Sequence, residues 1–478
     1  MFLDMLEQQA ARHPQAIALR GEGSVWSWQA YLAAVRDTAD TFTRLGIRRL
    51  ALELENSPEW AIVDLACLVS GIVVVPLPLF FTREQKAWVC ASASVDARVG
   101  GEAQTGWQSH PFLLGSVYTR TPQTLNPLPP GTAKVTYTSG TTGEPKGVCL
   151  SAEGMFWTAS ALASSLATRS LQKHLVTLPL SILLENLCGL YVPLILGVGT
   201  VILAPSRIGF EGSSRFNPEQ FLQALTHWQP ESLVLVPELL RVLLQLHQQM
   251  PQSTASLRFV AVGGGKIASQ LMEAAAQSGL PVFEGYGLSE CGSVVALNLP
   301  GASAQGSVGR ALPGIAVSLD KRRQLWVTSP ANALGYLGGA TFSGPVATGD
   351  IAHLSPDGFI TLEGRHRNVQ INAFGRNFSP EWPEAEAMAC PAVRRVVVFG
   401  DGLTRNVALV DALDGQEAAA RAQLDAISAR LPDYARLHRL LFTSAISTPA
   451  MLTANGRPRR KAIWKALQQQ ILTCSEEE

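Results

Sequence analysis

Short apolar runs alternate with amphipathic stretches from the N-terminus to about residue 365. The apolar runs have the length of buried strands, and we assign them to 50–54, 73–76, 135–138, 199–203, 233–236, 259–262 and 282–283. Apolar residues recur at helical spacing between them, over 28–45, 218–226, 238–249 and 269–278. Because strands that alternate with helices usually form parallel sheets covered by helices, this pattern predicts an α/β fold of layered, largely parallel sheets and helices.

The pattern changes after Gly364. A basic, polar turn at 365–368 is followed by a compact α+β pattern, with strands expected at 396–399 and 407–410 and helices at 417–431 and 460–472. We therefore expect a large N-terminal domain over residues 1–366 and a small C-terminal α+β domain over residues 367–478.

The apolar stretch at 187–204 approaches the length of a membrane-spanning helix. Gly189, Pro193, Gly197 and Gly199 interrupt it, so a buried helix, a glycine turn and a buried strand are expected there. A peripheral contact with a membrane remains open as an alternative.

Composition narrows the class of protein. The 478 residues are 47% hydrophobic and 16% charged, which fits a large buried core divided between domains. Lys and Arg together equal Asp and Glu at 38 each, whereas nucleic-acid-binding proteins are usually basic. The seven cysteines are scattered without a CxxC pair, and the N-terminus resembles no secretory signal. These features disfavour a zinc site or a disulfide framework and favour a cytoplasmic protein.

The chemistry is concentrated first in residues 137–147, which read YTSGTTGEPKG after an apolar strand. Glycines allow backbone N–H groups to approach anionic oxygens, hydroxyls add donors, and Lys146 adds a positive charge. The spacing differs from the GxxxxGK[ST] loop of P-loop NTPases. The segment predicts a polyphosphate-binding loop that includes Thr138, Ser139, Gly140, Thr141, Thr142, Gly143 and Lys146.

This loop resembles the signature loop of the adenylate-forming superfamily, which includes acyl-CoA synthetases, luciferases and the adenylation domains of peptide synthetases. Matching motifs follow in the family's order at 284–290 (EGYGLSE), 348–350 (TGD), 364–365, 375, 379–381 and 452–460 (LTANGRPRR). The resemblance covers about residues 130–461. It implies that the N-terminal domain binds ATP and an acid, and that the small domain moves about a hinge at Arg367.

The resemblance also assigns roles within an ATP site. Glu290 would hold Mg²⁺ against the phosphates, and a carboxylate suits that ion. Tyr286 would stack on adenine, Asp350 would accept the ribose hydroxyls, and Arg365 would donate to the ribose or the α-phosphate. Taken alone, Tyr286 is more typical of a core residue. The remaining ATP-binding residues are Gly264, Gly265, Lys266, Glu284, Gly285, Gly287 and Ser289.

Two departures from the family bear on catalysis and substrate. Arg457 stands where the family has a Lys that acts in adenylation, and Ile182 stands where a His is frequent. By resemblance, the acyl pocket would include Leu183, Leu187, Tyr191 and Gly263, and Gly375 would line the CoA tunnel. Because this expected pocket has alkyl walls and lacks a charge to bind an amino acid, its sequence is most similar to that of medium- or long-chain fatty acyl-CoA synthetases. The same leucines could equally be ordinary core.

The expected activity is therefore ATP-dependent conversion of a carboxylic acid to an acyl adenylate, with Lys146, Glu290 and Arg457 as catalytic residues. Transfer to the thiol of CoA would follow, and ATP, Mg²⁺ and CoA would be required. Two alternatives remain: transfer to the phosphopantetheine thiol of an acyl carrier protein, and a catalytically weak binder of nucleotide or acyl-AMP in which Arg457 marks the loss of the first step.

Overall fold

The computed structural model describes residues 1–101, 105–121, 125–138, 146–211, 215–371, 377–453 and 456–476. The first large sheet has the strand order β21-β9-β8-β4-β3-β5-β7-β6. In that order the strands span Gly335–Tyr336, Lys146–Ser151, Thr132–Thr138, Val73–Pro76, Arg49–Glu53, Ala97–Gly100, Gly115–Thr119 and Gln108–Phe112. The central strands β8, β4, β3 and β5 are parallel, and each of the outer strands β21, β9, β7 and β6 pairs antiparallel with its neighbours.

The second large sheet has the order β18-β17-β16-β15-β14-β10-β11-β1-β2. Its strands span Arg310–Ala311, Ala296–Leu297, Val282–Tyr286, Phe259–Val262, Ser232–Leu235, Lys173–Leu175, Gly199–Val201, Ile17–Arg20 and Val25–Ser27. The strands from β16 to β1 are parallel neighbours. The expected largely parallel arrangement is confirmed for the middle of both large sheets.

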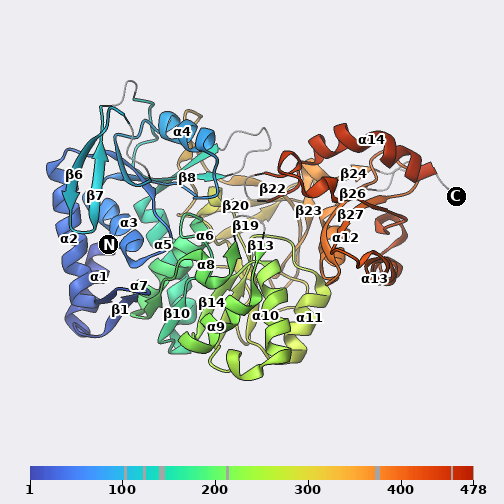
Figure 1. Ribbon diagram of the computed structural model, residues 1–478, viewed down its shortest axis with the longest axis horizontal. Helices are drawn as coiled ribbons and strands as arrows, with labels where there is room; N and C mark the ends of the chain where they lie inside the picture. The colour runs from blue at the N-terminus through green and yellow to red at the C-terminus, as the bar shows by residue number, and fades with distance from the viewer. Residues whose placement is uncertain are drawn as a thin grey trace.

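Helices fill and cover these sheets (Figure 1). One apolar core joins α2 (Trp28–Arg44), α3 (Pro58–Ser70) and α5 (Ala152–Leu166) to side chains of both large sheets. A second core joins β14 and β15 to α9 (Pro218–Trp228) and α10 (Pro237–Gln249). The other helices of this domain are α1 (Phe2–Arg12), α4 (Arg83–Ser92), α6 (Leu183–Glu185), α7 (Val192–Leu196), α8 (Pro205–Ile208) and α11 (Ser269–Ser278).

The apolar stretch at 187–204 forms a helix, a turn and a strand, as expected. A π-helix at Asn186–Tyr191 connects α6 to α7, and Gly197, with φ of 72°, caps the end of α7 before β11 begins. Within the described ranges, no helix has both the length and the apolar character needed to cross a membrane.

A four-stranded antiparallel sheet follows the second large sheet, and the sequence pattern did not separate it from the parallel layers. Its order is β19 (Ala316–Leu319), β20 (Gln324–Thr328), β22 (Val346–Leu354) and β23 (Ile360–Arg365). Buried and more exposed positions alternate along β22, which is the pattern of a strand with one face on a core. The expectation of alternating strands and helices up to residue 365 was therefore wrong for this last part.

The small C-terminal domain is built on the sheet β26 (Val393–Phe399), β27 (Val407–Ala412) and β28 (Arg439–Phe442). Its helices are α12 (Glu381–Met388), α13 (Glu417–Arg430) and α14 (Arg460–Glu476). Two-stranded pairs complete the chain: β24 (Gln370–Ile371) with β25 (Asn377–Phe378), and β12 (Phe210–Glu211) with β13 (Arg215–Phe216). This domain, orange to red in Figure 1, lies beside the large domain, which confirms the expected α/β fold with a small C-terminal α+β domain.

Candidate active site

The two strands that flank the expected phosphate loop form a hairpin-like pair. Thr138 is the last residue of β8, Lys146 is the first of β9, and the two are partners in the antiparallel register. The pairing therefore places both residues at one edge of the sheet, with the Lys146 side chain exposed. The other expected members of the loop, Ser139, Gly140, Thr141, Thr142 and Gly143, lie outside the described residues.

Lys146 and Glu290 are brought together by a residue that the sequence did not single out. The ammonium of Lys146 lies 5.5 Å from the centre of the Tyr336 ring, and the Tyr336 hydroxyl donates to Glu290 Oε1 at 2.8 Å. Burial and the charge of Glu290 raise the pKa of Tyr336, so its hydroxyl stays protonated and remains a donor. Glu290 lies in a 3₁₀ turn, Ser289–Cys291, that the expected ATP residue Ser289 opens.

A second group of expected residues meets at Asp350. The Tyr286 hydroxyl donates to Asp350 Oδ2 at 2.5 Å, and Arg365 Nε lies 2.8 Å from Asp350 Oδ1. Asp350 and Arg365 are register partners on β22 and β23, and Tyr286 ends β16. Tyr286 is 9% exposed and hydrogen-bonded by its hydroxyl, so its ring is largely packed. Three residues from separate motifs thus form one hydrogen-bonded unit.

The glycine loop after β15 lies against the end of β16. A Cβ at Gly263 would be 3.1 Å from the carbonyl oxygen of Gly285, so the two backbones are in close contact. Gly264 has φ of 80° and, with Gly265 and Lys266, is exposed. Lys266 donates to the Leu362 carbonyl of β23 at 2.7 Å, which ties this loop to the antiparallel sheet.

Glu284, at the centre of β16, is partly buried near Lys266. Burial raises the pKa of the Glu284 carboxyl to about 7, and the charge of Lys266 opposes that rise. Three residues further on, the backbone folds so closely that a Cβ at Gly287 would lie 1.5 Å from the Ser293 carbonyl oxygen. Gly287 is therefore required for the turn that presents Glu290, whatever else it contacts.

The residues expected to line an acyl pocket are packed into the core. Leu183 is 5% exposed and Leu187 is fully buried. The Tyr191 hydroxyl donates to Asp64 Oδ2 at 2.5 Å and accepts from Lys134 Nζ at 2.8 Å, inside a buried polar cluster. On the same helical segment, Leu184 and Cys188 are only partly buried; they pack against the same core as Ala261 and Phe283.

The small domain contributes one of the expected catalytic residues. A guanidinium nitrogen of Arg457 donates to the Gly264 carbonyl oxygen at 3.0 Å, across the boundary between the domains. The rest of the Arg457 side chain is exposed. Its cation therefore lies at the glycine loop whose residues Gly264 and Gly265 are expected to bind ATP. Gly375, expected in the CoA tunnel, lies outside the described residues.

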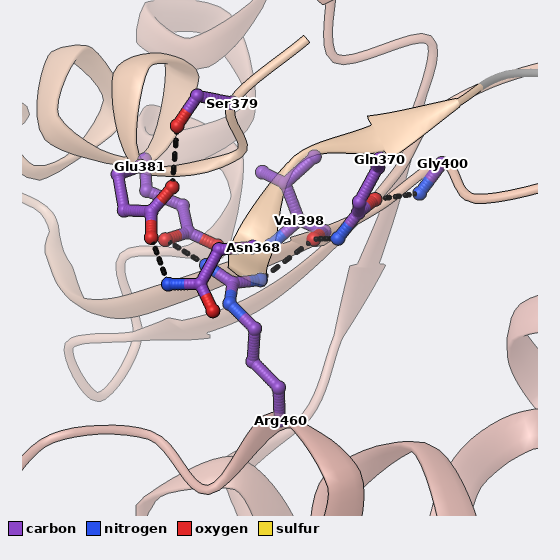
Figure 2. Close-up of polar contacts among 8 residues, drawn as sticks. Asn368, Gln370, Ser379, Glu381, Val398, Gly400 and Arg460 are labelled. Carbon is purple, nitrogen blue, oxygen red and sulfur yellow. Dashed lines mark hydrogen bonds and ion pairs between the residues drawn. The ribbon is translucent and has the colours of Figure 1, made fainter. Parts of the chain in front are cut away.

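Residues that follow Arg367 are bonded within the small domain (Figure 2). Asn368 donates to Glu381, which also accepts from Ser379. Gln370 donates to the Val398 carbonyl at 3.2 Å and accepts from the Gly400 N–H at 2.6 Å. Arg460 pairs with Glu384 and donates to the same Val398 carbonyl at 2.9 Å. Arg367 itself lies in the short turn His366–Asn368 that precedes this network.

Glu290 is the carboxylate in this region that fits a magnesium ion. Across the described ranges, no group of three or more His, Cys, Asp or Glu side chains could hold a metal ion. Mg²⁺ bound with a nucleotide usually takes one or two carboxylates, substrate phosphates and waters. Glu290 would supply one such carboxylate, and Tyr336 connects it to the exposed Lys146.

Known proteins that are similar to this chain in sequence or in fold include CoA ligases. A family model described as AMP-binding enzyme matches residues 6–337. The 2-succinylbenzoate–CoA ligase of Bacillus velezensis is 27% identical over 440 residues, covering 83% of this chain and 84% of that protein. Two solved structures share the fold: an anthranilate CoA ligase with anthranoyl-AMP (TM-score 0.80, 18% identity, 98% and 97% covered) and the Bacillus subtilis o-succinylbenzoate coenzyme A synthetase with ATP and magnesium ion (TM-score 0.74, 21% identity, 96% and 98% covered).

Proposed function

The chain belongs to the family of AMP-binding enzymes, and from this premise we propose that it is an acid–CoA ligase that works through an acyl adenylate. The observation that supports this most is the meeting of Lys146 and Glu290 at Tyr336, beside the unit formed by Asp350, Tyr286 and Arg365. These groups would supply cations for the phosphates, a carboxylate for Mg²⁺ and, in Asp350, a buried carboxylate for the ribose of ATP.

In the first step, a carboxylate oxygen of the acid attacks the α-phosphorus of ATP, and pyrophosphate leaves. Lys146, beside the Tyr336 ring, and Arg457, at the Gly264 carbonyl, would meet the negative charge that develops on the phosphoryl oxygens. Glu290 would hold Mg²⁺, which supplies further charge neutralisation when bound. Asp350 would accept from the ribose, with Tyr286 and Arg365 holding its carboxylate in place.

In the second step, the thiol of CoA attacks the acyl carbon of the adenylate, the bond to the phosphate oxygen breaks, and AMP leaves. We propose that the small domain rotates about Arg367 between the two steps. Asp350 pairs with Arg365 on one side of this residue, and Asn368 pairs with Glu381 on the other. The turn at Arg367 therefore separates two internally bonded parts, as a hinge does.

For the acid, we propose a molecule with an apolar alkyl or aryl tail. The support is the partly buried Leu184 and Cys188, which pack with Ala261 and Phe283 against one apolar core. A second candidate is 2-succinylbenzoate, because ligases for that acid are among the relatives most similar to this chain. Its second carboxylate would need a cation beyond those already used at the phosphates.

The two candidates are separated by one panel of acids. The purified protein is mixed with ATP, Mg²⁺ and octanoate, dodecanoate, anthranilate or 2-succinylbenzoate, with and without CoA, and AMP, pyrophosphate and thioester are quantified. We expect pyrophosphate only with an accepted acid, and AMP together with a CoA thioester when CoA is added. Production of ADP would contradict the proposed reaction. Formation of an adenylate that becomes a thioester only with a carrier-protein phosphopantetheine, and not with CoA, would contradict the proposed acceptor.

A further inference from the structure

Helix α11 begins without a capping side chain of its own. The residue before its first turn is Ala268, which offers no acceptor, although the first N–H groups of a helix need one. The acceptor comes from the other domain. Glu386 of α12 takes the Ser269 N–H on Oε1 at 3.1 Å. Since Glu386 is 7% exposed, this carboxylate is largely withdrawn from water at the positive end of α11.

Helix α12 receives a contact of the opposite kind in return. Arg241 of α10 donates to the carbonyl of Met388, the last residue of α12, at 3.1 Å, and lies 3.5 Å from the Cys390 carbonyl. Cations are favourable at the negative end of a helix, where carbonyls lack partners within the helix. The large domain therefore holds α12 at two points, through Glu386 and through its C-terminal carbonyls.

Both contacts exist only while the small domain keeps its present orientation. That orientation also brings Arg457 to the Gly264 carbonyl. A rotation about Arg367 would carry Glu386 away from Ser269 and Met388 away from Arg241. It would leave the start of α11 with Ala268 as its cap, which is among the poorest residues at this position.

We propose that Glu386 and Arg241 form a capping latch between the domains, which favours the orientation for acyl-adenylate formation and sets the balance between the two half-reactions. The second part of this statement rests on the proposed function. Glu386 and Arg241 are positioning residues, because they act through the placement of the small domain. The latch is broken by rotation and reformed when the small domain returns.

The latch itself is tested without turnover, by hydrogen–deuterium exchange of peptides that contain 268–272. Glu386→Ala should speed exchange in the first turn of α11, and Arg241→Ala should do so as well because it loosens the same docking. The exchange rate in Glu386→Gln should lie between those of the parent and Glu386→Ala, since the amide oxygen of Gln can still accept the Ser269 N–H. Glu417→Ala is the matched control: Glu417 is exposed at the start of α13 in the same domain, and its loss should leave α11 unchanged.

The two half-reactions test the consequence. Pyrophosphate release with acid and ATP but no CoA should fall up to about tenfold in Glu386→Ala and Arg241→Ala, as expected for one lost cap. Thiolysis of a supplied acyl adenylate should stay the same or become faster. The Glu417→Ala control should match the parent in both assays.

Unchanged exchange in α11 in both variants would overturn the latch. Equal losses in both half-reactions would assign Glu386 and Arg241 a purely structural role. Failure of the proposed function would look different: the parent would form no adenylate with any acid, while the exchange experiment would still decide whether the two domains are latched.

Discussion

At Glu290, one carboxylate oxygen accepts a hydrogen bond from the hydroxyl of Tyr336, whose ring lies 5.5 Å from the Lys146 ammonium. Glu290→Gln keeps the shape and an acceptor for Tyr336 but removes the negative charge that would attract Mg²⁺. We expect the rate of adenylate formation to fall about 10²-fold. Pyrophosphate release across a titration of Mg²⁺ measures this. Tyr336→Phe is the control for the hydrogen bond alone and should be affected less; a parental rate in Glu290→Gln would remove Glu290 from the metal site.

At Arg457, the guanidinium reaches the Gly264 carbonyl with one nitrogen and presents a planar fork. Arg457→Ala should slow acyl-adenylate formation about 10²-fold, which corresponds to about 2.7 kcal/mol, and should spare thiolysis of a supplied adenylate. Arg457→Lys should also be slower than the parent, because an ammonium cannot bond the Gly264 carbonyl and a second oxygen in the same way. Rapid adenylate formation in Arg457→Lys would mean that only the charge matters.

At Glu284, burial raises the pKa of the carboxyl to about 7. Between the unfolded pKa of about 4.3 and this value, the folded protein therefore holds a proton that the unfolded chain has released. Such a group stabilises the fold fully below the unfolded pKa of about 4.3, and this contribution is lost as the pH rises toward 7. The Tm of Glu284→Gln minus the Tm of the parent should therefore increase as the pH rises from about 5 to about 8, because Gln does not titrate. Glu417→Gln, an exposed control, should show a constant difference. A constant difference for Glu284→Gln would contradict its burial.

Lys146 was singled out because it lies in a loop rich in glycines and hydroxyls, and Glu290 and Asp350 because their short motifs resemble those of the adenylate-forming superfamily. The sequence missed Tyr336, which lies far along the chain from Lys146 and meets it through the pairing of β21 with β9. Arg241 and Glu386 were missed for the same reason. A contact made by tertiary pairing leaves no local pattern, since each residue is an ordinary member of its own helix or strand.

Among the elements, the segment from α6 through the π-helix carries the residues on which acid specificity is expected to depend. The sequence places Leu183 and Leu187 in the pocket, and the structure packs both into the core. Leu184 and Cys188 are four residues apart, so they share one face of a helical segment, and both are partly buried. The π-helical turn at Asn186–Tyr191 widens the backbone here, which a sequence pattern based on regular helices does not anticipate.

Leu184→Trp should therefore narrow the range of acids toward shorter or smaller tails, with each excluded methylene worth up to about 0.8 kcal/mol. Leu187→Trp should instead lower the Tm with little change in preference, because the added ring has no space in a filled core. The profile of pyrophosphate release across acids of different length, together with Tm, separates the two. A shift in profile in Leu187→Trp alone would place the pocket on the other face of the segment.

Most of the parallel strands were predicted, because continuous apolar runs mark strands buried on both faces. The parallel strands β1, β5 and β10 were missed. The antiparallel strands β19, β20, β22 and β23 were not predicted, since a strand such as β22 alternates buried with more exposed positions and has no continuous apolar run. In the small domain, the expected helices at 417–431 and 460–472 agree closely with α13 and α14. Strand β28 was missed because its four residues are only partly buried and include a charged Arg439.

For the whole molecule, the two-domain fold was predicted from a change in pattern near residue 364. At this boundary the two domains are in close contact: a Cβ at Gly364 would lie 2.0 Å from Ser379 Oγ, so the last strand of the large domain passes directly against the small domain. The orientation of the domains could not be read from the sequence, because it depends on contacts such as Arg457 with Gly264 and Glu386 with Ser269.

The central claim is that the acid attacks the α-phosphorus of ATP. The most direct measurement uses an accepted acid labelled with ¹⁸O in its carboxylate, together with ATP, Mg²⁺ and CoA, and follows the label by mass spectrometry. The account predicts that one ¹⁸O from the acid appears in the phosphate of AMP at each turnover, while pyrophosphate stays unlabelled. Label in inorganic phosphate with formation of ADP would contradict it, because the acid would then have attacked the γ-phosphorus.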